Sequence, residues 1–541
     1  MTFNSFQYAL LLLFVVAAFW ALRPPGRRWL LLVSSYVFYA SWDVRFTALL
    51  FVSTTVAFLA GGVLSRSDDD RTRKRVLAAT VVFNVGLLGF FKYFNFFIDS
   101  TEALLDRLGT TTPTWALQIA LPVGISFFTF QMLSYVVDVY RREADATDSY
   151  LTFLIFGSFF PHLLAGPICR ARRLIPQLGC TKRAPDPTQV AEGLELILIG
   201  LFQKVAVGDA LNQATGPIFA SFTDPAVARP SWATLWAATL ASVIQFVLDF
   251  AGYSNIARGS AKLLGIELPY NFRQPLTRSK DFQDFWRREH MTLMAWFRDY
   301  VYRPLHRRDA SPWYDHGVLL VLFALSGLWH GAAWVWVTWG LLVGSVLVIE
   351  LEVKRRRHAR TRAARKAERA AQREEERRAA AGGPVRLEPD AAALDDPDAA
   401  LLGEADHVAP EAGPPLVVRA RPRARPKADP WWRSLPVHTY VFVLIALQVA
   451  WIRTGAIGSG LELYGALFTP SAGGIDVDMA FLFLYALVAM VLTDNRQVQM
   501  ERVEGTPDPV TLPRAVGFGV MVVLIVVFSG APPQPFVYFQ F

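Results

Sequence analysis

A histidine inside an apolar stretch is the first residue of this sequence that could do chemistry. His330 follows Gly-Leu-Trp and precedes Gly-Ala-Ala-Trp. A polar ring is costly inside a membrane unless it is partnered, so an ionisable residue there is a functional candidate by default. A core histidine held by a backbone carbonyl is the simpler interpretation, but the surrounding glycines leave room for a substrate. Because neutral imidazole can take a proton from a hydroxyl near neutral pH, we predict a general base at His330, with Trp329 and Gly331 lining the substrate path.

A second histidine lies in a segment rich in aromatic and charged residues. Over 285–302 the apolar side chains recur at helical spacing, and charged residues supply the polar groups. An amphipathic helix in the membrane interface, with its arginines extended toward water, explains this pattern. It does not explain His290, which could face the protein interior and be catalytic. Arg298 and Asp299 are candidates for lining a substrate path.

Polar residues also gather in Asp249-Phe-Ala-Gly-Tyr-Ser-Asn-Ile-Ala257, at the expected cytoplasmic end of a span. A turn that ends the helix is sufficient to explain them, and Ser254 is kept as a candidate tunnel-lining residue. The sequence contains no phosphate-binding P-loop, no GxSxG elbow and no HExxH motif. Cys169 and Cys180 share a basic loop without paired histidines, so we expect no metal site.

The elements that must position these residues are membrane-spanning helices. The 541 residues have a mean hydropathy of +0.29, and 53% of them are hydrophobic. They form long apolar runs, which indicate a bilayer as the solvent. The net charge of +8 fits basic loops kept in the cytoplasm, and we expect no nucleic-acid partner. The N-terminal run lacks a preceding basic region and an evident cleavage site, so we expect a retained first helix with its N-terminus outside.

The apolar runs predict an all-α, polytopic integral membrane protein with about 11–12 transmembrane helices plus re-entrant or interfacial helices. A span needs about 20 apolar residues. The predicted spans are 8–22, 29–41, 45–64, 76–97, 120–140, 187–208, 231–252, 315–329, 331–350, 435–452, 476–494 and 514–530. Segment 149–166 is apolar but short, and we expect an interfacial or half-buried helix. A single helix over 315–350 would be about 50 Å long, too long for a core of about 30 Å, so we expect a break at 326–331, where Gly327 and Gly331 permit it.

The basic loops orient the spans. They predict that 65–75, 257–310 and 354–430 lie in the cytoplasm, while the loops near 98–114, 209–230 and 453–474 are poor in Lys and Arg. The predicted domains are a membrane core over 1–353, a charged low-complexity cytoplasmic insert over 354–430 and C-terminal membrane helices over 431–541. The insert is expected to be partly disordered. A solvated loop explains its basic block, and contact with lipid headgroups or a partner is the alternative.

Several motifs together resemble the membrane-bound O-acyltransferase (MBOAT) family, in the branch of the alginate O-acetyltransferase membrane subunit and the teichoic-acid D-alanyl transfer protein. They are Pro122-Val-Gly-Ile-Ser-Phe-Phe-Thr-Phe-Gln131, Phe160-Pro-His-Leu-Leu-Ala-Gly-Pro167, Gly252-Tyr-Ser254, Phe285-Trp-Arg-Arg288 with His290-Met-Thr-Leu293, Arg298-Asp-Tyr-Val-Tyr302, Gly327-Leu-Trp-His-Gly-Ala-Ala-Trp334 and Pro535-Phe-Val-Tyr-Phe-Gln-Phe541. Each motif alone is weak, but their order is specific. The resemblance covers nearly the whole chain except 354–430.

The resemblance implies an O-acyltransferase with a membrane-embedded tunnel in a bacterial cytoplasmic (inner) membrane. His330 matches the histidine common to the family, and His290 matches the second histidine of this branch. Three departures occur: Glu289 replaces an expected Trp, Asn255 replaces an expected Asp, and His306-Arg-Arg replaces the usual Gly-Gly. The implied donor is acetyl-CoA or a carrier-protein thioester, and no bound cofactor is implied. The implied partners are a secreted or periplasmic SGNH-type acyltransferase and an exported polysaccharide, besides the membrane lipid.

The expected mechanism joins a thioester from the cytoplasm with a hydroxyl from outside. His330 acts as the base, and His290 orients or polarises the acyl carbonyl. D-alanyl transfer to teichoic acid-type polymers from a carrier protein is the alternative within the family. A lipid or glycan transporter or flippase without acyl chemistry is the alternative of another class, and it would predict two related halves with interrupted helices. The sequence shows no such repeat.

Overall fold

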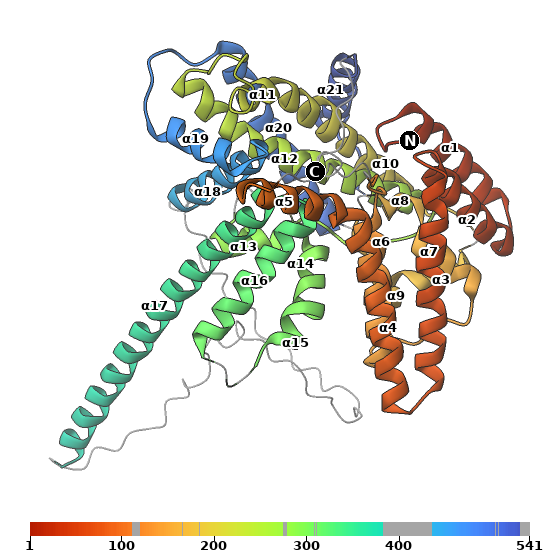
Figure 1. Cartoon of the computed structure of the whole chain (residues 1–541), viewed down its shortest axis with the longest axis horizontal. Helices are drawn as coiled ribbons and strands as arrows, with labels where there is room; N and C mark the ends of the chain where they lie inside the picture. Colours follow the sequence, from red (N-terminus) through yellow and green to blue (C-terminus); the bar gives the residue numbers. More distant parts are fainter. Residues whose placement is uncertain are drawn as a thin grey trace. The chain divides into compact units, whose positions relative to one another are not determined.

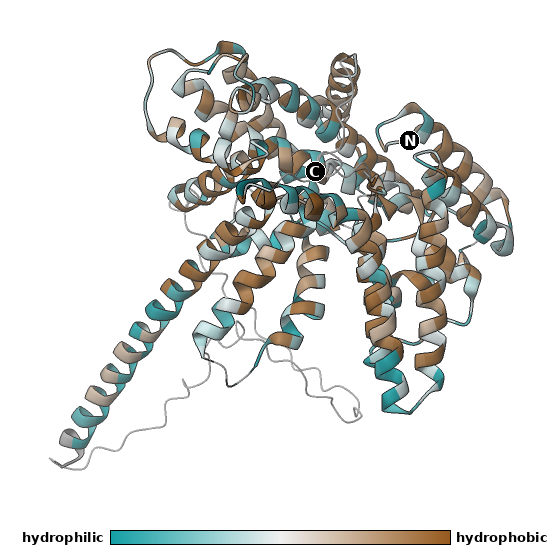
Figure 2. Cartoon of the chain, viewed as in Figure 1, coloured by the Kyte–Doolittle hydropathy of each residue, from teal (hydrophilic) through white to brown (hydrophobic). Residues whose placement is uncertain are grey.

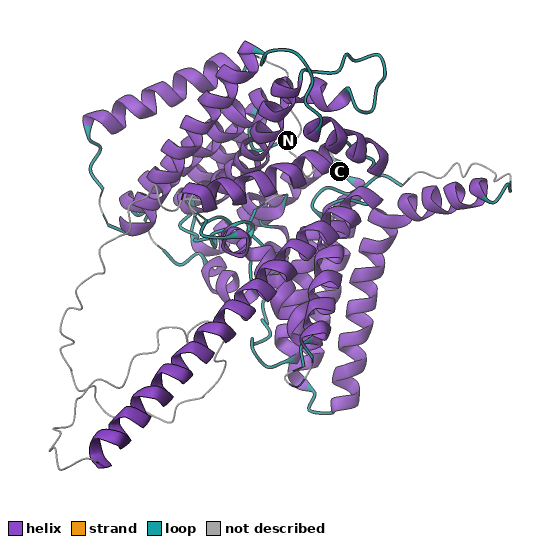
Figure 3. Ribbon diagram, turned by 90° about the vertical axis from the view of Figure 1, so that its left-hand side faces the viewer, coloured by secondary structure: helices purple, strands orange, loops and turns teal. Residues whose placement is uncertain are grey.

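The regular secondary structure of the described part of the protein is helical. The computed structural model describes residues 1–110, 119–164, 166–182, 184–273, 279–307, 309, 311–381, 435–503, 505–506 and 508–530. These residues form helices and loops, and no strand occurs among them (Figure 3). The chain divides into a membrane unit, 1–350 with 435–541, and a second unit, 351–434. The predicted all-α class is confirmed, while most of the insert expected over 354–430 and the C-terminal motif at 535–541 lie outside the described residues.

The N-terminal part of the membrane unit is a series of paired helices (Figure 1). They are α1 (Phe6–Ala21), α2 (Pro24–Ala40), α3 (Arg45–Arg66), α4 (Asp70–Leu88), the π-helical η1 (Gly89–Tyr93), α5 (Phe94–Arg107) and α6 (Ile125–Tyr140). The helices α3 and α4 lie side by side and are apolar along most of their length (Figure 2). Apart from Arg45 at the start of α3, their charged residues lie at the shared end, where Asp69 caps α4 by accepting from the amide of Thr72.

The middle of the chain alternates long and very short helices. They are α7 (Tyr150–Ser158), α8 (Phe160–Leu163), α9 (Ala171–Leu174), the 3-10 helix η2 (Ile175–Gly179), α10 (Pro187–Leu201), the π-helical η3 (Phe202–Asp209), α11 (Ala210–Ala220) and α12 (Trp232–Leu263). Residues 152–164 are buried throughout. The half-buried interfacial helix expected over 149–166 is therefore wrong, because α7 packs against α2 and α3 inside the protein.

The remaining helices carry the candidate histidines and the C-terminal spans. They are α13 (Phe282–Arg288), α14 (Met291–Phe297), the π-helical η5 (Arg298–Tyr302), α15 (Arg303–Leu305), α16 (Pro312–His330), α17 (Trp334–Ala381), α18 (Leu435–Arg453), α19 (Ile457–Phe468), α20 (Val477–Val503) and α21 (Leu512–Phe528). Each predicted span falls on described helices, although 76–97 covers parts of α4, η1 and α5, and 187–208 covers α10 and part of η3. Among the described residues, six helices are long and apolar enough to cross a membrane. A multi-pass membrane protein is thereby confirmed.

Helix α12 is the buried centre of the membrane unit, and all of its residues from Val247 to Leu263 are buried. It runs without interruption through Asp249–Ala257 to Leu263, so the helix-ending turn expected there is wrong. The carboxylate of Asp249 is neutralised by Lys204, whose Nζ lies 2.5 Å from Oδ1. Since the charge has a buried partner, the helix does not need to end at water. The first residues of the segment 257–310, expected in the cytoplasm, are likewise buried in α12.

Glycines bring the backbones of α10 and α12 into direct contact. A Cβ added at Gly200 would lie 2.6 Å from the carbonyl oxygen of Gly252, and one at Gly252 would lie 2.7 Å from that of Gly200. Two turns further along, Gly193 and Gly259 repeat the arrangement, with distances of 3.0 and 2.5 Å. Small residues let membrane helices approach closely where apolar burial gives no drive for association. We call these four residues the glycine seam.

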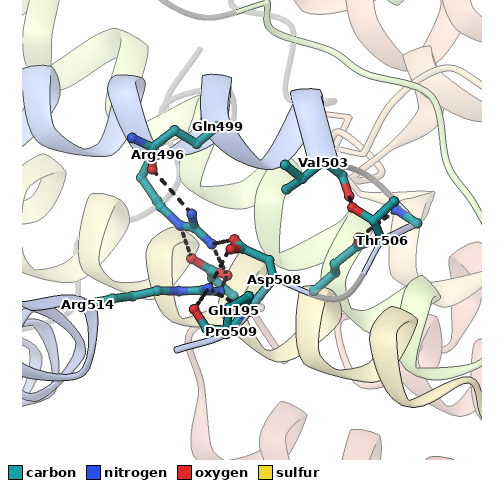
Figure 4. A network of polar contacts seen from close by, with 10 residues as sticks. Glu195, Arg496, Gln499, Val503, Thr506, Asp508, Pro509 and Arg514 are labelled. Atoms are coloured by element: carbon teal, nitrogen blue, oxygen red, sulfur yellow. Dashed lines mark hydrogen bonds and ion pairs between the residues drawn. The ribbon is translucent and has the colours of Figure 1, made fainter. Parts of the chain in front are cut away.

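An ion-pair network ties the C-terminal helices to α10 (Figure 4). Arg496 of α20 contacts both oxygens of Glu195, at 2.5 and 2.9 Å, and Arg514 of α21 contacts the same carboxylate. Both arginines also reach Asp508, at 2.8 and 3.0 Å. The hydrogen bond from Arg496 lowers the pKa of Asp508. The network fixes one end of α21, a helix with no fully buried residue.

The two ends of the membrane unit differ in charge. At one end Arg73 donates to the carbonyl of Tyr140 at 2.6 Å, and Arg170 pairs with Asp299 at 3.1 Å. We call this the basic end, and the opposite end the far end. The loop charges predict that the basic end lies in the cytoplasm.

The first prediction concerns the glycine seam. Gly200→Ala should lower the thermal stability of the purified protein, because the methyl group has to displace a backbone carbonyl, and overpacking costs about 1–3 kcal/mol. Gly216 in α11 has no heavy atom within 4 Å of its added Cβ. Gly216→Ala is the control and should be neutral or stabilising by up to about 1 kcal/mol. Equal melting temperatures for the two variants would contradict the close contact.

The second prediction concerns orientation. Both native cysteines are buried, so a single introduced cysteine can be followed with an impermeant maleimide. Ala472 lies exposed in the loop between α19 and α20, and Asp68 lies exposed between α3 and α4. In intact spheroplasts Ala472→Cys should react and Asp68→Cys should react only after lysis, because the basic end is expected in the cytoplasm. The reverse result would invert the topology.

Candidate active site

His330 stands at a break between two helices. It is the last residue of α16, and α17 begins at Trp334. The amide of Gly331 still donates to the carbonyl of Gly327, at 3.2 Å, before the backbone becomes extended. The sequence predicted this break from the length of the apolar run. The break leaves the imidazole at the end of a helix while it stays buried, with 6% of the residue exposed.

Aromatic rings surround the His330 imidazole. The ring of Trp336 stacks on it with a centroid distance of 5.7 Å, and that of Trp339 meets it edge-on at 5.3 Å. The neighbouring Trp329 lies at 4.9 Å. A Cβ added at Gly331 would lie 2.1 Å from Nε1 of Trp336, so the absence of a side chain there lets Trp336 reach the histidine. We call the rings of Trp329, Trp336 and Trp339 the aromatic wall. Gly331 makes room for this wall, a role that the sequence did not predict.

A lysine holds the end of α16, and sequence reasoning missed it. Lys92 comes from the π-helical η1 and donates to the carbonyl of Trp329; its Nζ also lies 3.4 Å from the carbonyl oxygen of His330. The adjacent Tyr93 donates to the carbonyl of Leu328, at 3.1 Å. The last carbonyls of a helix lack intrahelical partners, and these two side chains supply them. The signal in the sequence was a lysine within the apolar run Phe90-Phe-Lys-Tyr-Phe94.

His290 stands at a second break. It separates α13 from α14 and has φ 41° and ψ 48°, a left-handed conformation that is uncommon for residues other than glycine. The single amphipathic helix expected over 285–302 is therefore wrong. The strained turn is held on both sides, because Glu289 donates its amide to the carbonyl of Phe285 at 2.9 Å and Met291 donates to that of Asn271 at 2.8 Å. Strain kept in this way is typical of functional positions.

The His290 side chain points into the protein, where 1% of the residue is exposed. Its Nδ1 lies 3.0 Å from Oδ1 of Asn271. The ring of Phe250 meets it edge-on at 4.6 Å, and Trp329 lies at 5.9 Å. Trp329 is thus in contact with both histidines. Residues 40 positions apart in the sequence form one site.

Two cavities approach this pair of histidines. The far-end cavity has a volume of about 120 Å³. Its lining includes His330, Trp329, Lys92, Trp42, Ser126 and Phe127. The second cavity, the basic-end pocket, is narrower, at about 30 Å³. Its lining includes Ser254, Asn255, Arg258, Lys262, Tyr270 and Asn271. Asn271 lines the basic-end pocket and contacts His290, and His330 lines the far-end cavity, so each histidine is associated with a different cavity.

The structure brings together some of the predicted site residues and not others. His330, Trp329 and His290 are neighbours, and Ser254 joins them through Asn271, whose Nδ2 donates to Oγ of Ser254 at 3.2 Å. Arg298 and Asp299 do not line the two described cavities. They pair with each other at 2.9 Å, and Asp299 also pairs with Arg170 at the basic end. Their charges stabilise a loop cluster.

The family comparison agrees with this site. A model of the MBOAT, membrane-bound O-acyltransferase family, matches residues 33–371, a range that contains both histidines. The chain belongs to this family. Membership makes it an O-acyltransferase.

Several curated MBOAT-type proteins are similar to the chain. A probable alginate O-acetylase of Azotobacter vinelandii is 36% identical over 353 residues, which cover 65% of this chain and 68% of that protein. Its counterpart in Pseudomonas aeruginosa is 37% identical, with coverages of 65% and 66%. A peptidoglycan O-acetyltransferase of Helicobacter pylori is 32% identical over 346 residues, with coverages of 59% and 63%. The chain thus matches about two thirds of the length of these relatives.

The third prediction concerns the aromatic wall of this O-acyltransferase. Gly331→Ala should lower turnover by about ten- to a hundredfold, because the methyl group displaces Trp336 and misplaces His330. The backbone of Gly331 is extended, with φ −150°, so alanine adds no backbone strain. Gly317→Ala on the same helix is the control, since no heavy atom lies within 4 Å of its added Cβ. Unchanged turnover in Gly331→Ala at normal abundance would show that the wall does not position the histidine.

Proposed function

We propose that the chain moves an acetyl group from a cytoplasmic thioester to a hydroxyl on the outer side of a bacterial inner membrane. The observation that carries this proposal is that each histidine is associated with a different cavity. His330 lines the far-end cavity, and His290 is joined to the basic-end pocket by Asn271. A site reached from both sides lets two reactants meet without either crossing the whole membrane.

The chemistry follows from the residues at the junction. The acceptor hydroxyl in the far-end cavity gives its proton to His330 as its oxygen attacks the thioester carbonyl. A C–O bond forms, the C–S bond breaks, and the released thiolate takes the proton from His330 and leaves as a thiol, which returns His330 to its neutral form. General-base assistance of this kind contributes about 10²- to 10⁴-fold. The aromatic wall excludes water, which disfavours hydrolysis of the thioester.

Charges of both signs line the basic-end pocket, Arg258 and Lys262 with Glu192 and Glu501, and we assign Arg258 to the phosphate groups of a phosphorylated donor. The guanidinium of Arg258 stacks on Tyr270, with Cζ 3.7 Å from the ring centroid. Lys262 also lines the pocket and pairs with Glu192 at 2.7 Å and Glu267 at 2.8 Å. Arginine and lysine are the usual partners of phosphate. We propose acetyl-CoA as the donor, and a carrier-protein thioester, which carries a similar phosphorylated arm, as the alternative.

The far-end cavity has room for an acetyl group. A cavity of about 150 Å³ holds a benzene ring, so the 120 Å³ beside His330 accommodates an acetyl group, and a cavity of about 270 Å³ that shares Lys92 and Leu121 with it adds space for the acceptor. The relatives named above are an alginate O-acetylase and a peptidoglycan O-acetyltransferase. Both names support an exported polysaccharide as the final acceptor, either directly or through a secreted SGNH-type acyltransferase partner.

One alternative, within the same family, has specific support. A teichoic acid D-alanyltransferase of Bacillus subtilis is 30% identical over 230 residues, covering 40% of this chain, which supports D-alanyl transfer as the alternative within the family. The chemical nature of the transferred group separates it from acetyl transfer. A transporter or flippase would move a substrate without breaking a C–S bond, so it would not depend on a proton acceptor at His330.

The fourth prediction tests the general base. His330→Gln and His330→Ala should lower acyl transfer by about 10²- to 10⁴-fold, because an amide can hydrogen-bond but cannot take the proton. Transfer is measured in membranes with labelled acetyl donor, alongside protein abundance. His316→Gln makes the same change near the other end of α16 and should transfer normally. Near-normal transfer by His330→Gln at normal abundance would overturn the proposal.

A further inference from the structure

Asn271 is the centre of a hydrogen-bond group around His290, and no motif in the sequence pointed to it. Its Oδ1 lies 3.0 Å from Nδ1 of His290 and accepts from the hydroxyl of Thr292 at 2.8 Å. Its Nδ2 donates to Oγ of Ser254 at 3.2 Å, and its carbonyl accepts from the amide of Met291 at 2.8 Å. The residue is buried, with 1% exposed. Asn271 therefore forms hydrogen bonds with His290, with the turn that carries His290 and with helix α12.

The orientation of this amide follows from its neighbours. The hydroxyl of Thr292 already accepts from the amide of Ile168, at 3.0 Å, so its hydrogen is available to donate to an acceptor. Oδ1 of Asn271 is that acceptor. On the other side, Nδ2 needs an acceptor, and Oγ of Ser254 supplies it. Turning the amide over would place its two hydrogens against Thr292 and His290 and leave its oxygen beside Ser254.

The amide orientation decides which nitrogen of His290 carries the proton. An amide oxygen only accepts hydrogen bonds, so Nδ1 of His290 must donate. In a neutral imidazole the other nitrogen is then the acceptor. We infer that Asn271 is a positioning residue that fixes the Nδ1–H tautomer of His290, so that Nε2 accepts a hydrogen bond during acyl transfer while the hydroxyl proton goes to His330. This inference rests on the proposed function and deepens it.

The inference changes the role that the sequence predicted for His290. Polarising an acyl carbonyl requires an N–H directed at the carbonyl oxygen, and the neutral Nδ1–H tautomer has none at Nε2. The ring instead offers Nε2 to a hydrogen-bond donor of the substrate. The two histidines then have different roles: His330 takes the hydroxyl proton, and His290 accepts a hydrogen bond at Nε2.

The surroundings of His290 contain few groups that could titrate with it. From α6 and α12 it meets the rings of Phe127 and Phe250, and from α16 the ring of Trp329. His330, which also contacts Trp329, is the titratable group across the site, and Glu289 is its neighbour in the chain. A charge placed at position 271 would act on the ring directly.

The first arm of the test observes the tautomer. The full chain is labelled with ¹⁵N-histidine, reconstituted in nanodiscs and studied by NMR, with His290→Gln used to assign the signal. We expect His290 to be protonated at Nδ1 and unprotonated at Nε2 at neutral pH. In Asn271→Leu the signal should move toward a mixture of the two tautomers. A wild-type His290 protonated at Nε2 would overturn the inference whatever the activity of the His330 variants, so the inference and the proposed function fail separately.

The second arm, and the fifth prediction, measures turnover against pH. Asn271→Leu should lower kcat by about ten- to a hundredfold at normal abundance, because the ring loses its fixed orientation. Asn271→Asp keeps an acceptor for Nδ1–H and should retain more activity. Its carboxylate stabilises the protonated ring, so the acidic limb of its pH profile should move to higher pH by about one unit.

A buried amide elsewhere is the matched control. Asn84 of α4 accepts from the hydroxyl of Ser53 at 2.8 Å, and Asn84→Asp should leave the pH profile in place. Equal losses in Asn271→Leu and Asn271→Asp, with no movement of the profile, would reduce Asn271 to a structural residue.

Discussion

A helix inside a bilayer can be interrupted only where the protein binds the backbone groups that the interruption exposes. Both candidate histidines stand at such interruptions. At the end of α16, the carbonyls of Leu328 and Trp329 accept from Tyr93 and Lys92. At the turn before α14, the amide of Met291 donates to Asn271. The groups that bind these exposed backbone atoms therefore also fix the positions of the two imidazole rings. The site and the fold depend on the same hydrogen bonds.

The sequence predicted those parts of the site that depend on local properties. The break at His330 followed from an apolar run too long for one span and from the glycines within it. The burial of His290 was expected because an amphipathic helix in the membrane interface did not explain a histidine at that position. Lys92 and Asn271 were missed because their roles depend on partners distant in the sequence, Trp329 being 237 positions from Lys92. Local composition cannot report such pairings.

Two other expectations also depend on partners that are distant in the sequence. Asp249 was expected near water because a lone carboxylate is costly in a membrane, whereas Lys204 neutralises it inside the protein. Arg298 and Asp299 were expected beside the substrate because they lie close to His290 in the sequence. The helical turns between them carry both side chains to the basic end, where Asp299 pairs with Arg170. Closeness in the sequence therefore does not predict closeness in space where the chain passes through a left-handed turn, as it does at His290.

The glycine seam has a mechanical meaning. Where two helix backbones touch at Gly200 and Gly252, and again at Gly193 and Gly259, neither helix can roll or slide without driving a carbonyl into its neighbour. Alternating-access transporters depend on one group of helices rocking against another, and this interface resists that motion. The interface between α10 and α12 is therefore expected to stay rigid during turnover. Donor and acceptor then meet by diffusing into the site, without a large movement of these helices.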